Sequence, residues 1–360
     1  MGKSIFQKPV RIPLTETPLH ECSEVMDVVI TSIFPPTTGA VKLAEGLSRD
    51  CGGRLWVVGD RKSPSTYDLE GATFLGIEAQ GSDGSRLAAK LPENCYSRKN
   101  LGYVAAIWAG ARFVVETDDD NIPLDSFWEK RIERFAAREV NVDGWYNVYK
   151  DFSDVVIWPR GYPLEEIRVE HSTGMHDAGL IEGESLVVQG LADGDPDVDA
   201  IFRLTRDLPV TFEDGPPVRL QEGCWCPFNS QNTTFFRSAF PLLYLPSYCS
   251  FRMTDIWRSF VAQRCLWAMG STLAFTRATM FQERNNHSLL RDFEQEIPGY
   301  LANEKIRAVL EAIDLQPGRE AETVSNNLVS CYRALVAADI LPEKELPLID
   351  IWCDDILSVL

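Results

Sequence analysis

The sequence has no long run of apolar residues, and its N-terminus lacks the apolar core of a secretory signal peptide. A membrane-spanning helix needs about 20 consecutive, mostly apolar residues, so no transmembrane segment is expected. The chain is therefore predicted to be cytoplasmic.

A cysteine framework is also missing. The nine cysteines are an odd number and follow no repeating spacing. Cys224 and Cys226 flank Trp225, but neither a second cysteine pair nor a nearby histidine completes a zinc-binding pattern. Buried, unpaired thiols in a reducing compartment are therefore expected.

Positive charge is scarce. Lys and Arg number 35 against 53 Asp and Glu, which gives a formal net charge of −18. Bulk electrostatics therefore exclude nucleic acid and anionic membranes as favoured partners. A polyphosphate substrate would need local compensation, from a metal ion or from clustered Arg and Lys side chains.

Internal repeats and low-complexity linkers are absent too, and the hydrophobic content of 45% is typical of a globular protein. Residue patterns predict strands at 25–33, 54–58, 73–77 and 113–117, and helices at 40–49, 128–139, 256–269, 302–313, 323–338 and 347–359. Strands alternating with helices predict an α/β fold with a mixed, mainly parallel, Rossmann-like sheet covered by helices. The simplest partition is an N-terminal arm at 1–24, one domain at 25–298 and a helical extension at 299–360.

Polar residues follow the first two predicted strands. Thr31 and Ser32 end the first strand, and Asp60 and Lys62 follow the second. Because ligands of such sheets bind beyond the carboxyl ends of the strands, all four are candidate substrate-binding residues. Asp60 could accept a hydrogen bond from uracil or ribose, or it could simply stabilise a turn.

Three consecutive aspartates, Asp118, Asp119 and Asp120, follow the predicted strand at 113–117. Like charges raise one another's pKa, so this arrangement is costly without a cation. Side chains alternate along a strand, so Asp118 and Asp120 are expected to point the same way, as oxygen ligands for Mn²⁺ or Mg²⁺. Asp119 would then contact the substrate. The alternative is a solvated acidic turn.

The residues before this strand form an ordered block. Residues 97–103 (Ser-Arg-Lys-Asn-Leu-Gly-Tyr) lead into a helix rich in small residues, which the glycine at 110 closes. With the strand and the aspartates, the block resembles nucleotide-sugar glycosyltransferases of the GT-A fold. The resemblance implies that the aspartates hold a divalent ion on the diphosphate, and it makes Arg98 and Asn100 candidate substrate contacts.

A second block begins at Asp255. In inverting glycosyltransferases, an acidic residue followed by a Gln/Arg-x-x-Trp-like element supplies the base and the acceptor channel. Residues 263–267 are similar in order, but they lack the usual Arg immediately before the Trp. Asp255 is therefore a candidate base for the acceptor hydroxyl, and Arg258 is a candidate for stabilising the departing diphosphate. The alternative role for Asp255 is a helix N-cap, and one residue can do both.

Residues 158–163 (Trp-Pro-Arg-Gly-Tyr-Pro) resemble the plant reversibly glycosylated polypeptides, which are UDP-arabinopyranose mutases. Segments 188–200, 227–233 and 251–258 are more similar to the STELLO glycosyltransferase-like proteins, and the resemblance to this broader family covers about residues 25–295. The aspartate motif also continues as Asp-Asp-Asn, the STELLO-like form, where the mutases have Asp-Asp-Cys. STELLO proteins carry a membrane anchor that this sequence lacks, so a Golgi setting is not expected.

The resemblances add further candidates. Arg160 occupies the motif position of the arginine implicated in mutase self-glycosylation. His287 is a candidate third metal ligand or a surface residue. Asp193 and Asp195 open an alternating aspartate run that lacks the distal Glu of a calcium-binding EF-hand, so this turn is expected to shape the acceptor pocket. Gln231, in the STELLO-like segment 227–233, is a further candidate substrate-binding residue.

These residues together predict a metal-dependent, inverting glycosyltransferase. Its donor would be a nucleoside-diphosphate sugar, namely a UDP-sugar, and its acceptor a glycan or another hydroxyl compound. Two alternatives use the same diphosphate site: a nucleotide-sugar mutase, and a non-catalytic nucleotide-sugar-binding partner of other enzymes. The sequence leaves the sugar, the acceptor and the oligomeric state open.

Overall fold

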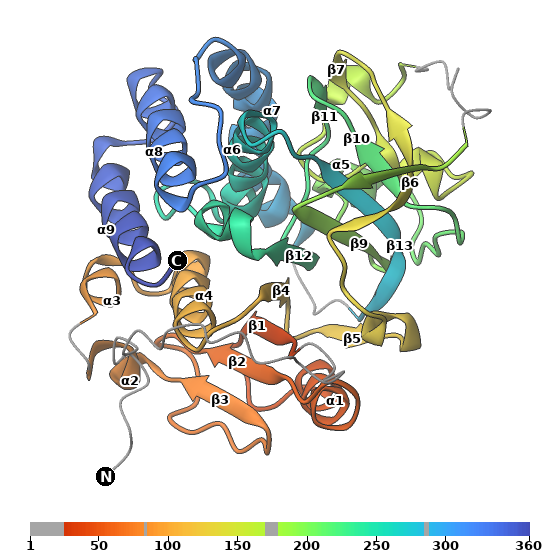
Figure 1. Cartoon of the computed structure of the whole chain (residues 1–360). Coiled ribbons are helices and arrows are strands. Elements are labelled where there is room, and N and C mark those ends of the chain that lie inside the picture. The colour runs from red at the N-terminus through yellow and green to blue at the C-terminus, as the bar shows by residue number, and fades with distance from the viewer. Residues whose placement is uncertain (1–24, 83–84, 170–178, 284–287) are drawn as a thin grey trace.

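A computed structural model describes residues 25–82, 85–169, 179–283 and 288–360 (Figure 1). The first part of the chain alternates strands and helices, as the sequence predicts. Its elements are β1 (Asp27–Thr31), α1 (Thr38–Gly46), β2 (Arg54–Val58), β3 (Ala72–Leu75), α2 (Ile77–Ser82), α3 (Arg86–Lys90), the 3-10 helix η2 (Tyr96–Arg98), α4 (Lys99–Trp108) and β4 (Phe113–Thr117).

The second part contains shorter strands and then the long helices. In chain order these elements are β5 (Asn121–Pro123), the 3-10 helix η3 (Asp125–Trp128), β6 (Arg134–Val140), β7 (Gly144–Trp145), β8 (Ile181–Glu184), β9 (Val187–Gly194), α5 (Ala200–Thr205), β10 (Val218–Leu220), β11 (Cys224–Trp225), β12 (Asn232–Phe236), the 3-10 helices η6 (Arg237–Leu243) and η7 (Phe251–Met253), α6 (Thr254–Ala268), β13 (Leu273–Gln282), α7 (Leu289–Glu311), α8 (Ala321–Ala337), the 3-10 helix η8 (Glu343–Glu345) and α9 (Leu346–Leu357).

One large mixed sheet organises the described residues. Its order is β3-β2-β1-β4-β12-β9-β13-β10-β6-β8, and β5 pairs with β13. The first four strands run parallel, and β12 joins them antiparallel to β4. The carboxyl ends of β1, β2 and β4 therefore meet at one edge, which confirms the expected common rim and the expected α/β, GT-A-like fold class.

Local sequence explains the N-terminal half of this sheet. The central strands are short apolar runs buried on both faces, as parallel strands covered by helices require. Helix α4 approaches the sheet at Gly102, where a Cβ would lie 2.6 Å from side-chain atoms of both Val29 and Val58. A larger residue at 102 would push α4 away from the strands that carry the rim.

The C-terminal helices share the core of the sheet domain. Helix α6 packs against α7 and α8, while α9 lies beside α3 and α4 (Figure 1). The expected boundary between residues 298 and 299 falls inside α7, which runs through Pro298. The division into a domain and a separate extension stays a prediction.

The helix predicted at 128–139 is wrong. The chain forms η3 and then β6, which pairs parallel with β10 and antiparallel with β8. The sequence has helical spacing, but both backbone edges of this segment find strand partners that are distant in the chain. Tertiary pairing therefore overrides the local preference.

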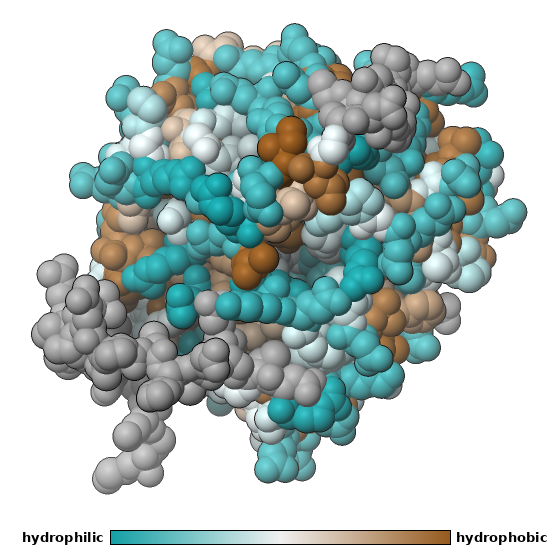
Figure 2. Space-filling view, turned by 45° about the vertical axis from the view of Figure 1, so that its right-hand side comes forward, coloured by the Kyte–Doolittle hydropathy of each residue, from teal (hydrophilic) through white to brown (hydrophobic). Residues whose placement is uncertain are grey.

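The surface is largely hydrophilic on the face in Figure 2, where the apolar residues are interrupted by hydrophilic ones. Single exposed apolar residues are normal on a folded protein. The apolar content of the sequence is instead concentrated in one buried cluster that includes residues of β1, α6 and α9.

Candidate active site

The three aspartates lie in a turn directly after β4, where the amide of Asn121 donates to the carbonyl of Asp118 over 3.3 Å. Strand alternation therefore does not apply to them, and each carboxylate meets a different partner. Asp118 accepts from Tyr96, Asp119 accepts from Ser32, and Asp120 accepts from the Gln282 amide. The strand argument for a shared face of Asp118 and Asp120 therefore fails, because β4 ends at Thr117, and their joint binding of a metal ion stays a prediction.

Negative charge accumulates in this turn. Burial raises the pKa of Asp119 to about 6, and burial with the charges of Asp118 and Asp119 raises the pKa of Asp120 to about 7. A bound divalent cation would favour the ionised form of both carboxylates and so lower both pKa values.

The residues present fit such an ion, because carboxylate and amide oxygens are the hard ligands that Mg²⁺ and Mn²⁺ prefer. No cluster of three His, Cys, Asp or Glu side chains forms a metal site within the described ranges. Asp118 and Asp120 would therefore need substrate phosphate and water to complete the shell. His287, the candidate third ligand, lies outside the described residues.

A buried lysine that the sequence analysis passed over contacts the motif. Lys99 is fully buried, and its Nζ donates to the carbonyl of Thr117 over 2.6 Å, to the Tyr96 hydroxyl over 2.9 Å and to Asp118 over 3.2 Å. In the sequence, Lys99 stands between Arg98 and Asn100, the two residues predicted to contact the substrate. This position is the sequence feature that could have identified Lys99 as part of the site.

Those two neighbours serve the fold. The Arg98 guanidinium donates to Gln80 and to the carbonyl of Leu91, and the Asn100 side chain exchanges two hydrogen bonds with the backbone of Leu245. Both are buried and hydrogen-bonded to other parts of the chain, so they position η2 and α4.

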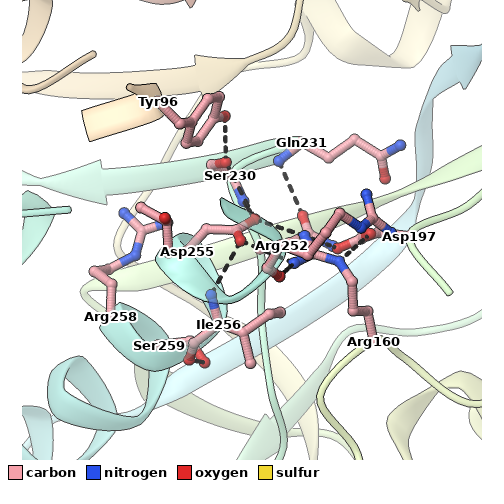
Figure 3. A network of polar contacts seen from close by, with 12 residues as sticks. Tyr96, Arg160, Asp197, Ser230, Gln231, Arg252, Asp255, Ile256, Arg258 and Ser259 are labelled. Atoms are coloured by element: carbon pink, nitrogen blue, oxygen red, sulfur yellow. Dashed lines mark hydrogen bonds and ion pairs between the residues drawn. The ribbon is translucent and has the colours of Figure 1, made fainter. Parts of the chain in front are cut away.

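Asp255 lies at the start of α6, with Ser230 between it and Tyr96 (Figure 3). The N-cap of α6 is Met253, which makes no side-chain cap bond, so Asp255 is not the N-cap residue. Its carboxylate accepts from the Arg160 guanidinium over 2.9 Å and 3.1 Å and from the backbone amide of Ser230 over 3.2 Å, and it lies 3.3 Å from the Ser230 hydroxyl.

These donors govern the chemistry of Asp255. Burial alone would raise its pKa, but the Arg160 charge and hydrogen bonds hold the pKa below the usual value. A hydroxyl that gives its proton to Asp255 must first displace one of these donors. The base role of Asp255 stays a prediction.

Arg160 is enclosed by acidic residues. Its guanidinium donates to Asp197 over 2.7 Å and 2.8 Å, to both oxygens of Asp255, and to the carbonyl of Arg252 (Figure 3). The side chain is only 7% exposed, so it holds Asp255 and Asp197 together and has little access to a substrate.

Arg258 lies deeper than its predicted role requires. It pairs with Glu116 of β4 over 2.6 Å, and its guanidinium sits over the rings of Phe228 and Phe235. Both members of the ion pair are buried. In this arrangement Arg258 joins α6 to β4 behind the aspartate turn and does not reach the rim.

The candidate nucleotide residues line the rim as expected. Ser32 follows β1 and contacts Asp119, while half-buried Thr31 ends β1. Asp60 accepts from the amides of Arg61 and Cys95 over 2.7 Å and 3.0 Å, so it stabilises the local turn. Lys62 is exposed.

The alternating aspartates do not converge on a cation. Asp193 accepts from the Phe212 amide, Asp195 pairs with Arg203, and Asp197 pairs with Arg160. Asp199 caps α5 by accepting from the Phe202 amide over 2.7 Å. Gln231 is tied to the aspartate turn instead, because its amide donates to Gln282, which in turn donates to Asp120.

The cysteines within the described ranges have free thiols, and the reducing compartment stays a prediction. Cys224 and Cys226 are free and buried, and five other described cysteines are free. Within the same ranges, no helix has the length and apolar character that crossing a membrane demands.

Comparisons with known proteins agree with the sequence motifs. The family model of the STELLO glycosyltransferases matches residues 252–360. Two relatives from Arabidopsis thaliana, "Probable glycosyltransferase STELLO1" and "Probable glycosyltransferase STELLO2", are 30% and 29% identical over 246 and 266 residues. The matches confirm the STELLO-like resemblance, and they extend it beyond residue 295 through the C-terminal helices.

These matches cover 62% and 68% of this chain but 31% and 34% of the relatives. The chain therefore spans about a third of the length of the relatives it matches.

Solved structures show weaker likeness. Glucosyl-3-phosphoglycerate synthase from Mycobacterium tuberculosis, in complex with Mn²⁺, UDP-glucose and glycerol 3-phosphate, is 12% identical with a TM-score of 0.40, over 79% of this chain and 80% of that one. A mycobacterial protein is 14% identical with a TM-score of 0.41, over 79% and 74%. Likeness at this level carries no part of the functional assignment.

Proposed function

We propose, from the relationship of this chain to the STELLO glycosyltransferases, that it transfers a sugar from a nucleoside-diphosphate donor, a UDP-sugar, to a hydroxyl acceptor with the help of Mn²⁺ or Mg²⁺. The observation that carries the proposal is the meeting of the two predicted half-sites. Asp118 and Asp255 are 137 positions apart in the sequence (255 − 118), yet both lie one hydrogen bond from the Tyr96–Ser230 hydroxyl pair.

The donor half of the site is the rim formed by β1, β2 and β4. Asp118 and Asp120 would hold the metal ion, which would neutralise the diphosphate and stabilise it on departure. Ser32 and Asp60 follow β1 and β2 on the same rim, where ribose and base would lie. The ammonium group of Lys99 offsets part of the negative charge of Asp118.

The acceptor half is the start of α6. Asp255 would take the proton of the acceptor hydroxyl, and attack from the face opposite the diphosphate would invert the anomeric centre. Arg160 and Ser230 fix the carboxylate, so an incoming acceptor would replace the Ser230 hydroxyl, the longest of the four contacts described above.

Self-glycosylation of Arg160, which the mutase resemblance implied, is not part of this proposal. The guanidinium is buried, and Nε, Nη1 and Nη2 all donate to protein oxygens. To act as a nucleophile, the Arg160 guanidinium would have to break its ion pairs with Asp197 and Asp255.

One experiment separates the proposed transferase from the alternatives. The protein is incubated with Mn²⁺ and a panel of nucleotide sugars, and free UDP and the sugar ring form are followed by chromatography. Metal-dependent UDP release that an acceptor accelerates supports transfer. Ring interconversion without UDP release would indicate a mutase, and binding without turnover would indicate a non-catalytic partner.

A cytoplasmic location belongs to the proposal, supported by the free thiols of the described cysteines. Fluorescence of the full-length gene product tagged at its C-terminus would test it, and a signal confined to a secretory compartment would contradict it. The oligomeric state is a separate question for light scattering.

A further inference from the structure

The Tyr96 hydroxyl is shared by the two halves of the site. It lies 2.8 Å from Asp118 Oδ1, 2.6 Å from Ser230 Oγ and 2.9 Å from Lys99 Nζ. An ammonium group can only donate, so the phenol oxygen accepts from Lys99. The single phenol proton is then left for Asp118 or Ser230.

The proton positions follow from the neighbours. A carboxylate only accepts, so the Tyr96 proton goes to Asp118, which also accepts from Lys99 over 3.2 Å. The Ser230 hydroxyl lies 2.6 Å from the Tyr96 oxygen and 3.3 Å from Asp255, and its one proton goes to the nearer Tyr96 oxygen. Asp255 then receives from the Ser230 backbone amide. A chain Ser230 → Tyr96 → Asp118 results, in which each bond polarises the next.

Packing fixes this arrangement. Ser230 is 1% exposed and Lys99 is fully buried. The Tyr96 ring meets the ring of Phe251 edge-on, with centroids 5.8 Å apart, and η2 joins directly to α4. The phenol is thus held on rigid elements beside Asp118, and Figure 3 shows its contact with Ser230, the neighbour of Asp255.

We propose that Tyr96 is a positioning residue that orients Asp118 for the divalent cation, and that Ser230 acts on the cation only through Tyr96. The inference rests on the proposed function, because it concerns the same metal ligand. Hydrogen bonds to metal-binding carboxylates fix their orientation, and loss of such a partner costs metal affinity.

The test is a double-mutant cycle on the intact chain, read by calorimetric titration with Mn²⁺ in the presence of UDP. Tyr96→Phe keeps the ring and its contact with Phe251 but removes the hydroxyl, and Mn²⁺ affinity should fall by roughly 10–100-fold. Ser230→Ala should weaken Mn²⁺ binding several-fold in the parent. Ser230→Ala should have no effect on Mn²⁺ affinity in the Tyr96→Phe background, because the hydroxyl that connects Ser230 to Asp118 is absent from that variant.

Matched variants control for general damage. Ser259 of α6 is a buried serine like Ser230, and its hydroxyl donates to the carbonyl of Ile256 over 2.6 Å. Tyr300 is a half-buried tyrosine that donates to Glu296 over 2.7 Å. Ser259→Ala and Tyr300→Phe should leave Mn²⁺ affinity unchanged.

The outcomes distinguish failure of the positioning role of Tyr96 from failure of the proposed function. Suppose that the parent binds Mn²⁺ in the presence of UDP. The positioning role is then overturned, and the proposed function stands, if Tyr96→Phe binds Mn²⁺ like the parent. The same holds if the losses of Mn²⁺ affinity in Tyr96→Phe and Ser230→Ala are independent, so that they multiply in the double variant. If the parent has no Mn²⁺–UDP affinity, the proposed function and this inference fail together. Thermal unfolding of each variant without metal shows whether it is folded.

Discussion

Each aspartate after β4 meets a different environment, although the three are neighbours in the sequence. Asp118 is partly exposed and lies beside Lys99, Asp119 is covered by Ser32, and Asp120 faces Gln282. Substitutions of single residues in this turn should therefore have separable effects.

Asp120→Asn should abolish Mn²⁺-dependent binding of a UDP-sugar in calorimetry while leaving the fold intact. The substitution removes a ligand and also a charge that Asp118 and Asp119 repel, so the metal-free melting temperature should stay the same or rise slightly. Asp125→Asn, an exposed aspartate in η3, is the matched control. Unchanged donor affinity in the presence of Mn²⁺ would count decisively against this metal site.

Asp255→Asn tests the base. The variant keeps the shape of the side chain but cannot take a proton, so transfer should fall by roughly 10²–10⁴-fold while donor binding stays near normal. Asp197→Asn is a close control, because it also removes one carboxylate from the Arg160 guanidinium. Asp197→Asn should lower transfer far less.

Two results would contradict the assignment of Asp255 as the catalytic base. One is equal loss of transfer in Asp255→Asn and Asp197→Asn, which would show that Asp255 acts through Arg160. The other is a product that retains the donor's anomeric configuration.

At the scale of elements, buried carboxylates join helices to strands. Glu116 of β4 pairs with Arg258 of α6 and accepts from Tyr103 of α4, and Asp199 caps α5 while accepting from the Trp158 indole over 2.8 Å. Such groups fix how elements meet, and their protonation is linked to stability.

Asp199 should make the free energy of unfolding depend on pH. Burial raises its pKa to about 6, above the ordinary value of 3.8. The folded chain therefore holds this proton more tightly than the unfolded chain, so the contribution of Asp199 to stability is greatest below about pH 4 and falls until about pH 6.

Urea unfolding between pH 4.5 and 7 measures this contribution. Asp199→Asn carries no ionisable group, so the parent should lose stability relative to the variant as the pH rises. Asp207→Asn, at an exposed aspartate just beyond α5, should follow the parent. A constant difference between parent and Asp199→Asn across this range would contradict the linkage.

At the scale of the whole molecule, the C-terminal helices support the site. Glu345 of η8 is fully buried and accepts from the amides of Ser247 and Tyr248 over 3.0 Å and 2.9 Å. The Ser247 hydroxyl contacts Ser97 of η2 over 2.7 Å, one residue from Tyr96. The last 60 or so residues are thereby connected to the wall of the active site.

Trp352→Ala should destabilise the whole protein by about 3–5 kcal/mol, the usual cost of truncating a buried tryptophan. Trp352 is fully buried in α9, and its indole donates to the carbonyl of Pro241 over 2.9 Å. Chemical denaturation should remain one cooperative transition with a lower midpoint. Leu357→Ala, a partly exposed control in the same helix, should cost far less. A separate early transition for Trp352→Ala would show that α9 unfolds independently.

The sequence by itself determined the parallel strands of the first half, the rim at their carboxyl ends and the acidic motif after β4. These features depend on local patterns: short apolar strands, a small-residue helix and a strand-end turn. The helices predicted at 256–269, 323–338 and 347–359 also correspond to α6, α8 and α9.

Only the tertiary structure decided which side chains meet. Tyr96, Lys99 and Ser230 carry no special spacing, and they became part of the site because α4 and the segment before β12 converge on the aspartate turn. Arg98 and Arg160 are candidate substrate contacts and Arg258 a candidate diphosphate contact in the sequence, yet acceptors inside the fold hold each guanidinium. The reason is physical: a buried guanidinium must be matched by acceptors, and in this chain other elements of the fold supply those acceptors.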